Sequence, residues 1–185
     1  MSFHIKPGLL TRRECISAAA KIVAGLIVSS PLASLATPLN YHTLSFYHTH
    51  TGETLDLVFN LKTGKPEKVK RVTHFLRDFR TGDVHSIDPR LLDMLCRLQV
   101  ECCSAGTFEV ISGYRSPVTN EKLRKKTNGV AKKSLHMEGR AIDIRLSDIP
   151  TRNLGAKARS LKFGGVGYYA KSDFIHVDTG RVRSW

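Results

Sequence analysis

The sequence SLHMEGRAIDIRL, residues 134–146, ends in an alternation of apolar and polar side chains. Such alternation is typical of a strand with one face in the core, and it predicts a strand over residues 140–146. Asp143 lies on the polar face of this strand, so its carboxylate is expected to point out of the sheet into a cleft. His136 comes seven residues earlier, in a loop before the strand. An imidazole and a carboxylate are therefore expected to lie close together.

A second histidine occurs in FIHVD, residues 174–178, where the apolar neighbours of His176 predict another strand. Two imidazoles and one carboxylate leave the fourth position of a tetrahedral zinc ion open for water, which is typical of catalytic zinc. Zinc lowers the pKa of bound water to about 7 and polarises a carbonyl, and amide hydrolysis requires both. From spacing alone, structural histidines remain the alternative.

The rest of the chain predicts one α+β domain, residues 37–185, with a small antiparallel central sheet, flanking helices and a zinc cleft. Asp88 followed by Pro89 is a helix-start signal, a cap and then a first-turn proline. The expected strands are 43–47, 54–59, 108–112, 140–146, 167–169 and 174–178, and the expected helices lie over 69–79, 89–98, 120–126 and 150–162.

Residues 1–36 have the order of an export signal: basic residues, an apolar run and then small residues. Thr11-Arg12-Arg13 resembles the start of a twin-arginine signal. Cleavage is expected after Ala36, which would leave the domain in the periplasm. The apolar run is short and interrupted by Lys21, so a membrane contact is expected only if the signal stays uncleaved as an anchor.

The formal net charge of +13 favours anionic partners. Export excludes nucleic acid and leaves the carboxylate-rich peptides of a cell wall, with a solvated basic surface as the alternative. The domain is expected to be a monomer. Its three cysteines, Cys96, Cys102 and Cys103, are an odd number without paired Cys-x-x-Cys spacing, so they are expected to be packing residues.

Three ordered motifs resemble the signature of the D-alanyl-D-alanine metallopeptidases, relatives of the lysostaphin and hedgehog zinc folds. They are Ser112-Gly113-Tyr114-Arg115-Ser116, Ser134-x-His136-x-x-Gly139-x-Ala141-x-Asp143 and Phe174-x-His176. The resemblance covers roughly residues 43–185. It implies a zinc-dependent peptidase that hydrolyses peptide cross-links between the glycan strands of peptidoglycan. The alternatives are a D,D- or L,D-carboxypeptidase that trims stem peptides, and a non-catalytic wall-binding module.

By this resemblance, zinc is bound by His136, Asp143 and His176, and Arg115 holds a substrate carboxylate or carbonyl beside the metal. Arginine suits that role because its planar donor fork grips a carboxylate with two hydrogen bonds.

Many family members place an acid three residues before the last histidine ligand, which makes Asp173 the expected general base. Asp178, on the same strand face as His176, is the competing base or else the hydrogen-bond partner of the outer imidazole nitrogen. Ser134 is a secondary candidate that orients His136, contacts substrate or only caps a turn.

Overall fold

The computed structural model describes residues 41–60, 65–66, 69–127 and 129–185. The predicted export signal, residues 1–36, lies outside these residues. Within the described part of the chain, no helix is both long and apolar enough to cross a membrane.

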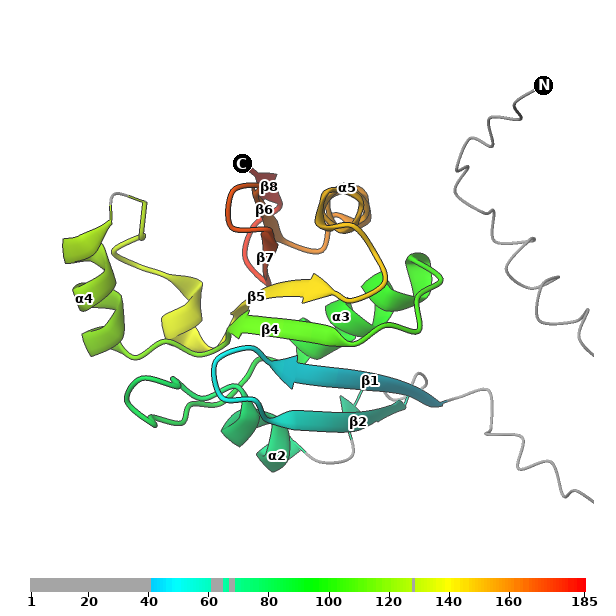
Figure 1. The fold of residues 1–185 in the computed structure, drawn as a ribbon, viewed down its shortest axis with the longest axis horizontal. Coiled ribbons are helices and arrows are strands. Elements are labelled where there is room, and N and C mark those ends of the chain that lie inside the picture. Colours follow the sequence, from blue (N-terminus) through cyan, green and yellow to red (C-terminus); the bar gives the residue numbers. More distant parts are fainter. Residues whose placement is uncertain (1–40, 61–64, 67–68, 128) are drawn as a thin grey trace, which may run out of the picture. The chain divides into compact units, whose positions relative to one another are not determined.

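A mixed sheet of eight strands forms the centre of the described domain (Figure 1). The strands lie in the order β3-β2-β1-β4-β5-β7-β6-β8. Two neighbouring pairs are parallel, β1 with β4 and β6 with β8, and the other pairs are antiparallel. The strands are β1 Tyr41–His48, β2 Thr54–Asn60, β3 Lys65–Pro66, β4 Phe108–Ser112, β5 Ala141–Leu146, β6 Gly165–Tyr169, β7 Phe174–Asp178 and β8 Arg183–Ser184.

The predicted α+β class is confirmed, but the prediction of a small antiparallel sheet is wrong. Strand β1 lies parallel to β4 because a long connection containing helices separates the two strands along the chain, which is what a parallel pair requires. Strands β3 and β8 were not predicted. Each has only two residues, too few to show an alternation of side chains.

The described residues form four α-helices and one 3₁₀ helix: α2 Val69–Phe75, α3 Pro89–Glu101, α4 Pro117–Lys126, η1 Leu135–Glu138 and α5 Thr151–Leu161. Helix α3 begins where the sequence predicts, because the side chain of Asp88 accepts a hydrogen bond from the Arg90 N–H. Helix α4 begins earlier than predicted, since Ser116 caps it by accepting from the Thr119 N–H. Helix α2 ends at Phe75, short of the predicted residue 79.

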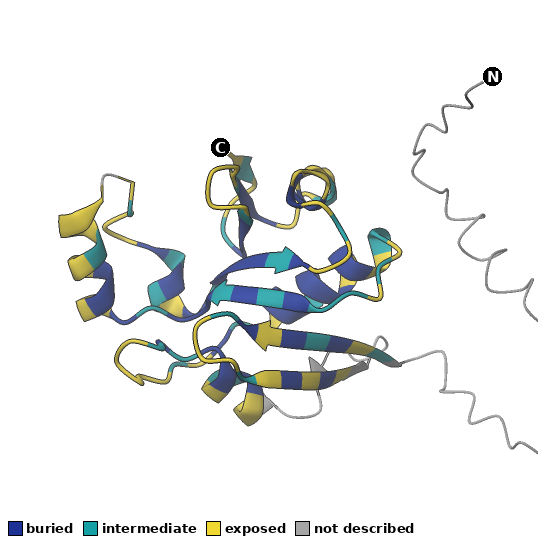
Figure 2. Ribbon diagram, in the orientation of Figure 1, coloured by how far each residue is buried: buried dark blue, intermediate teal, exposed yellow. Residues whose placement is uncertain are grey.

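The core lies between the sheet and helices α2, α3 and α5. Helices α3 and α5 contact each other, α5 packs against β5, β6 and β7, and α3 packs against β1. Ile142 and Ile144 of β5 are fully buried with Leu91 and Leu95 of α3. Figure 2 shows buried positions along the central strands and on α3, whereas α4 is largely exposed. The other face of β5 is therefore free to carry polar side chains.

Candidate metal centre

The pairing of β5 with β7 places two of the predicted ligands side by side. Asp143 lies directly opposite His176 in the antiparallel register. His136 comes from η1, which Gly139 ends in a left-handed conformation at φ 63 just before β5 begins. Side chains from η1 and from two neighbouring strands thus meet where Asp143 pairs with His176.

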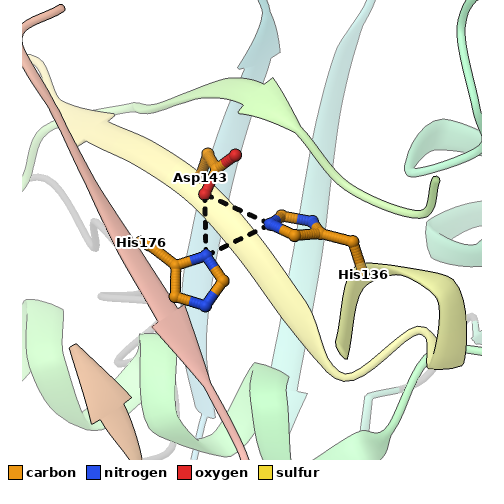
Figure 3. A group of neighbouring side chains, drawn as sticks. All are labelled: His136, Asp143 and His176. Carbon is orange, nitrogen blue, oxygen red and sulfur yellow. Dashed lines mark hydrogen bonds and ion pairs between the residues drawn. The ribbon is translucent and has the colours of Figure 1, made fainter. Parts of the chain in front are cut away.

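The three ligand-type atoms have the spacing of a metal site (Figure 3). Nε2 of His136 lies 3.1 Å from Nδ1 of His176 and 3.3 Å from Oδ1 of Asp143. Nδ1 of His176 lies 2.9 Å from the same Oδ1. A zinc ion with tetrahedral bonds of about 2.0–2.1 Å separates its ligand atoms by about 3.3 Å. Small adjustments of these buried side chains would accommodate the ion.

The outer hydrogen bonds decide which ring nitrogens face the centre. Nδ1 of His136 lies 2.7 Å from the carbonyl oxygen of Gly113, which can only accept, so this nitrogen carries the hydrogen. Nε2 of His176 lies 2.9 Å from Oδ2 of Asp178 and donates to it. In neutral rings, His136 Nε2 and His176 Nδ1 then present lone pairs toward the carboxylate of Asp143. Three converging lone pairs fit a cation.

Protonation and metal binding compete at this centre. Burial disfavours the charged form of His176, but hydrogen bonds to Asp143 and Asp178 outweigh it and raise the pKa of His176 to about 9. Burial also acts to raise the pKa of Asp143, yet the charges and hydrogen bonds of His136 and His176 hold it well below its usual range. A metal ion must therefore displace a proton from His176, which makes metal binding pH-dependent.

The loop after β4 supplies the carbonyl that orients His136. Gly113 approaches Leu76 so closely that a Cβ would lie 2.7 Å from the Leu76 carbonyl oxygen, so only glycine fits. A register shift between Val110 and Ser112 interrupts the pairing with β5 at this point. Such bulges redirect the chain beside active sites. The close approach to Leu76 thus explains why the motif has glycine at residue 113.

The triad lines a cleft of about 820 Å³, which residues of α4 and the following loop share with residues of β6, β7 and β8. Arg115 lies in this cleft with Nη2 3.7 Å from Oδ2 of Asp143. Among the described residues, its buried Nε has no hydrogen-bond partner. Ser134 also lines the cleft, at the start of η1, and its side chain makes no capping bond. The structure brings both residues to the triad.

Asp173 is the predicted site residue that the structure does not bring to the triad. It lies in a turn with φ 49 before β7, and its side chain is 64% exposed. Its carboxylate lies 3.7 Å from Nη1 of Arg145, in a separate groove that none of the triad residues lines. The family resemblance makes Asp173 the expected base, because it stands three residues before His176. The predicted role of base has no geometric support here.

Two residues at the cleft were not predicted. Arg183 contacts Asp178, and Trp185 places its ring 5.4 Å from the ring of His176. The Trp185 indole donates to the hydroxyl of Tyr169 at 2.9 Å, although the Trp185 residue stays 51% exposed. Arg183 and Trp185 lie beyond the last motif, Phe174-x-His176, and the two-residue strand β8 gives no periodic pattern there. The signal that could have indicated them is an exposed tryptophan two residues after an arginine.

An α+β domain with a His–Asp–His centre open to a cleft has the architecture of a metallopeptidase. The chain belongs to the family described as peptidoglycan L,D-endopeptidase MepK, and the sequence model of that family matches residues 37–185. This confirms the predicted family, the D-alanyl-D-alanine metallopeptidases, and the predicted enzyme class, a peptidase.

Curated relatives agree with the family match. The chain is 39% identical over 176 residues to the peptidoglycan L,D-endopeptidase MepK of Escherichia coli K12, covering 94% of this chain and 96% of the relative. It is 42% identical over 162 residues to the probable peptidoglycan L,D-endopeptidase MepK of Haemophilus influenzae, covering 86% and 87%. No solved structure matched the chain.

Proposed function

We propose that this protein is a zinc-dependent endopeptidase that hydrolyses peptide cross-links in bacterial peptidoglycan. The single observation that carries the proposal is the convergence of three lone pairs from His136, Asp143 and His176 at the cleft. The family membership and the printed names of the relatives support the substrate.

In this proposal the three triad residues hold zinc, which when bound would acidify water and polarise the scissile carbonyl. Arg115 binds a carboxylate or carbonyl of the substrate, because its guanidinium lies beside Asp143 and the residue lines the cleft. Its position beside Asp143 places that substrate group next to the reacting carbonyl. Ser134 contacts the substrate from the start of η1, since this residue lines the same cleft and its side chain does not cap η1.

Asp178 and Asp173 have different roles in this proposal. The geometry supports Asp178 as the partner that orients His176, because the carboxylate is fully buried and already hydrogen-bonded through both oxygens. Asp173 is paired with Arg145 in its own groove, and we propose that it acts outside the metal centre. Asn variants of the two residues test these roles.

The names of the relatives favour an L,D bond as the preferred cross-link, which would join two diaminopimelate residues. The D-alanine to diaminopimelate bond is the comparison substrate. Carboxypeptidase trimming of stem peptides remains the second activity, and it releases a single terminal residue instead of separating two stem peptides. The masses of the products distinguish these reactions.

A wall substrate supports a location outside the cytoplasm. We propose that residues 1–36 direct export to the periplasm by the twin-arginine route and are then removed, leaving a monomeric domain from Thr37 onward. The order of basic, apolar and small residues in this segment supports the proposal.

The decisive experiment is digestion of purified, cross-linked wall fragments, with product masses read before and after chelation of zinc. We expect separated stem peptides with the metal and intact cross-links without it, and restored cleavage on adding zinc back. Cleavage that continues unchanged after complete chelation would contradict the zinc mechanism. Binding of wall material without any hydrolysis would instead favour the wall-binding module.

A further inference from the structure

We propose that Arg183 is a positioning residue of the metal centre. Its guanidinium holds the carboxylate of Asp178, and Asp178 in turn holds the imidazole of His176 so that Nδ1 faces the other two ligands. This inference rests on the metal site of the proposed function and extends it to a residue that does not touch the metal.

Arg183 grips Asp178 with two parallel hydrogen bonds. Nη1 donates to Oδ1 at 3.0 Å and Nη2 donates to Oδ2 at 2.7 Å. Oδ2 also accepts from Nε2 of His176 at 2.9 Å. A bidentate pair of this kind fixes the plane of the carboxylate as well as its position. The fixed carboxylate then fixes the rotation of the imidazole ring.

The backbone closes around this pair from two sides. The N–H groups of Gly165 and Gly180 donate to Oδ1 of Asp178 at 3.1 Å and 2.8 Å. A Cβ at Gly165 would collide with the guanidinium of Arg183, and a Cβ at Gly180 would lie 2.9 Å from Oδ1. Glycine at both positions lets the backbone reach the carboxylate and leaves it little room to move.

The pair also balances charge. Asp178 is fully buried, and a buried carboxylate is costly unless a cation and hydrogen bonds compensate it. Among the described residues, Arg183 is the lysine or arginine that forms an ion pair with it. Strand pairing sets the position of Arg183, because it lies in register with Gly165 of β6. Its guanidinium also lies 4.9 Å from the ring of Trp185 on the cleft wall.

The test measures the zinc dissociation constant of the chain by competition with a chromophoric chelator at fixed pH. Arg183→Met should weaken zinc binding by about 10- to 100-fold, the usual effect of losing a partner behind a metal ligand. Arg183→Lys should restore part of the affinity. The matched control is Arg181→Met, which removes the same charge from an exposed position two residues away and should leave the affinity unchanged. Cobalt substitution gives a second readout, since the absorption bands of bound cobalt should shift in Arg183→Met.

Circular dichroism of the zinc-free variants shows whether each is folded at the measuring temperature. If Arg183→Met is unfolded there, Arg183→Lys carries the test. A folded Arg183 variant with wild-type zinc affinity and an unchanged cobalt spectrum overturns the inference, and so does an equal loss in Arg181→Met. Wall digestion is scored separately: a wild-type protein that binds zinc without cutting the wall overturns the proposed function alone. A wild-type protein that binds no zinc overturns both.

Discussion

The imidazole of His136 has one nitrogen committed to the Gly113 carbonyl and the other directed at Asp143. Because alanine removes the ring nitrogen that faces Asp143, His136→Ala should reduce bound zinc from one ion per chain to nearly none. Elemental analysis of the purified protein measures this. His50→Ala, which removes an exposed imidazole outside the triad, is the control and should keep one zinc. A zinc content near zero in the wild type, without recovery on adding metal, would contradict the site.

Asp173 and Asp178 differ in burial and partners, so their Asn variants should differ in effect. Asp173→Asn should keep zinc and most of its turnover, because the exposed carboxylate lies in a separate groove. Asp178→Asn should weaken zinc affinity or activity by about 10- to 100-fold. Zinc affinity is measured by titration, and the turnover of both variants is measured at saturating zinc. A loss of about 100-fold in Asp173→Asn with full zinc occupancy would restore Asp173 as the base, since general-base catalysis supplies that range.

Protonation of His176 stabilises the zinc-free protein, because its pKa of about 9 exceeds the ordinary value of 6.5. The contribution is fully present below pH 6.5 and is lost as the pH rises through 9. Its size is at most about 3 kcal/mol. Urea unfolding of chelator-treated protein should therefore show a falling free energy of unfolding over this range. The trend should be weaker in His176→Gln, and equal trends in both proteins would refute the assignment.

At the scale of elements, Asp88 ties the start of α3 to the chain beyond β7. Its carboxylate accepts from the Arg90 N–H at 3.0 Å and from the Thr179 hydroxyl at 2.7 Å. Asp88→Ala should lower the free energy of unfolding by about 1 kcal/mol or more, the usual cost of losing a helix cap. Asp88→Asn, which can still cap the helix, should cost less. Urea unfolding at neutral pH measures both variants, and equal costs would show that the charge matters more than the cap.

The same carboxylate predicts an acid dependence. Burial acts to raise the pKa of Asp88, but hydrogen bonds from Arg90 and Thr179 outweigh it and lower the pKa from 3.8 to about 2. The stabilisation is therefore present above pH 3.8 and is lost as the pH falls through about 2. The difference in unfolding free energy between wild type and Asp88→Asn should shrink over this window. A difference that stays constant down to pH 2 would contradict this account.

For the whole molecule, the order of residues 1–36 predicts that the exported protein begins at Thr37. Intact mass of protein recovered from the periplasm measures this. Replacing Arg12 and Arg13 by Lys should retain the precursor in the cytoplasm if the twin-arginine route is used. Recovery of a chain that keeps Met1 in the membrane fraction would favour an uncleaved anchor instead.

The sequence by itself determined the α+β class and the strands that carry Asp143 and His176, and together with the family resemblance it named His136, Asp143 and His176 as candidate ligands. These follow from local information: side-chain alternation marks the strands, and His and Asp are chemically suited to a metal wherever they meet. Helix starts were predicted where a cap has a distinctive residue pair, as at Asp88 and Pro89. Ser116 and Pro117 carry the same cap-and-proline signal, but this start was missed because the pair belongs to a motif that was interpreted as a loop.

Only the tertiary structure decided which groups surround the triad. The register of β5 against β7 sets Asp143 opposite His176, and register depends on pairing between distant segments. Asp173 has a positive φ and its carboxylate lies beside Arg145, although the family resemblance makes it the expected base. Strand β8 brings Arg183 to Asp178, yet two residues carry no periodic signal. Local patterns and the family resemblance therefore name the candidate ligands, while long-range pairing chooses the residues that surround them.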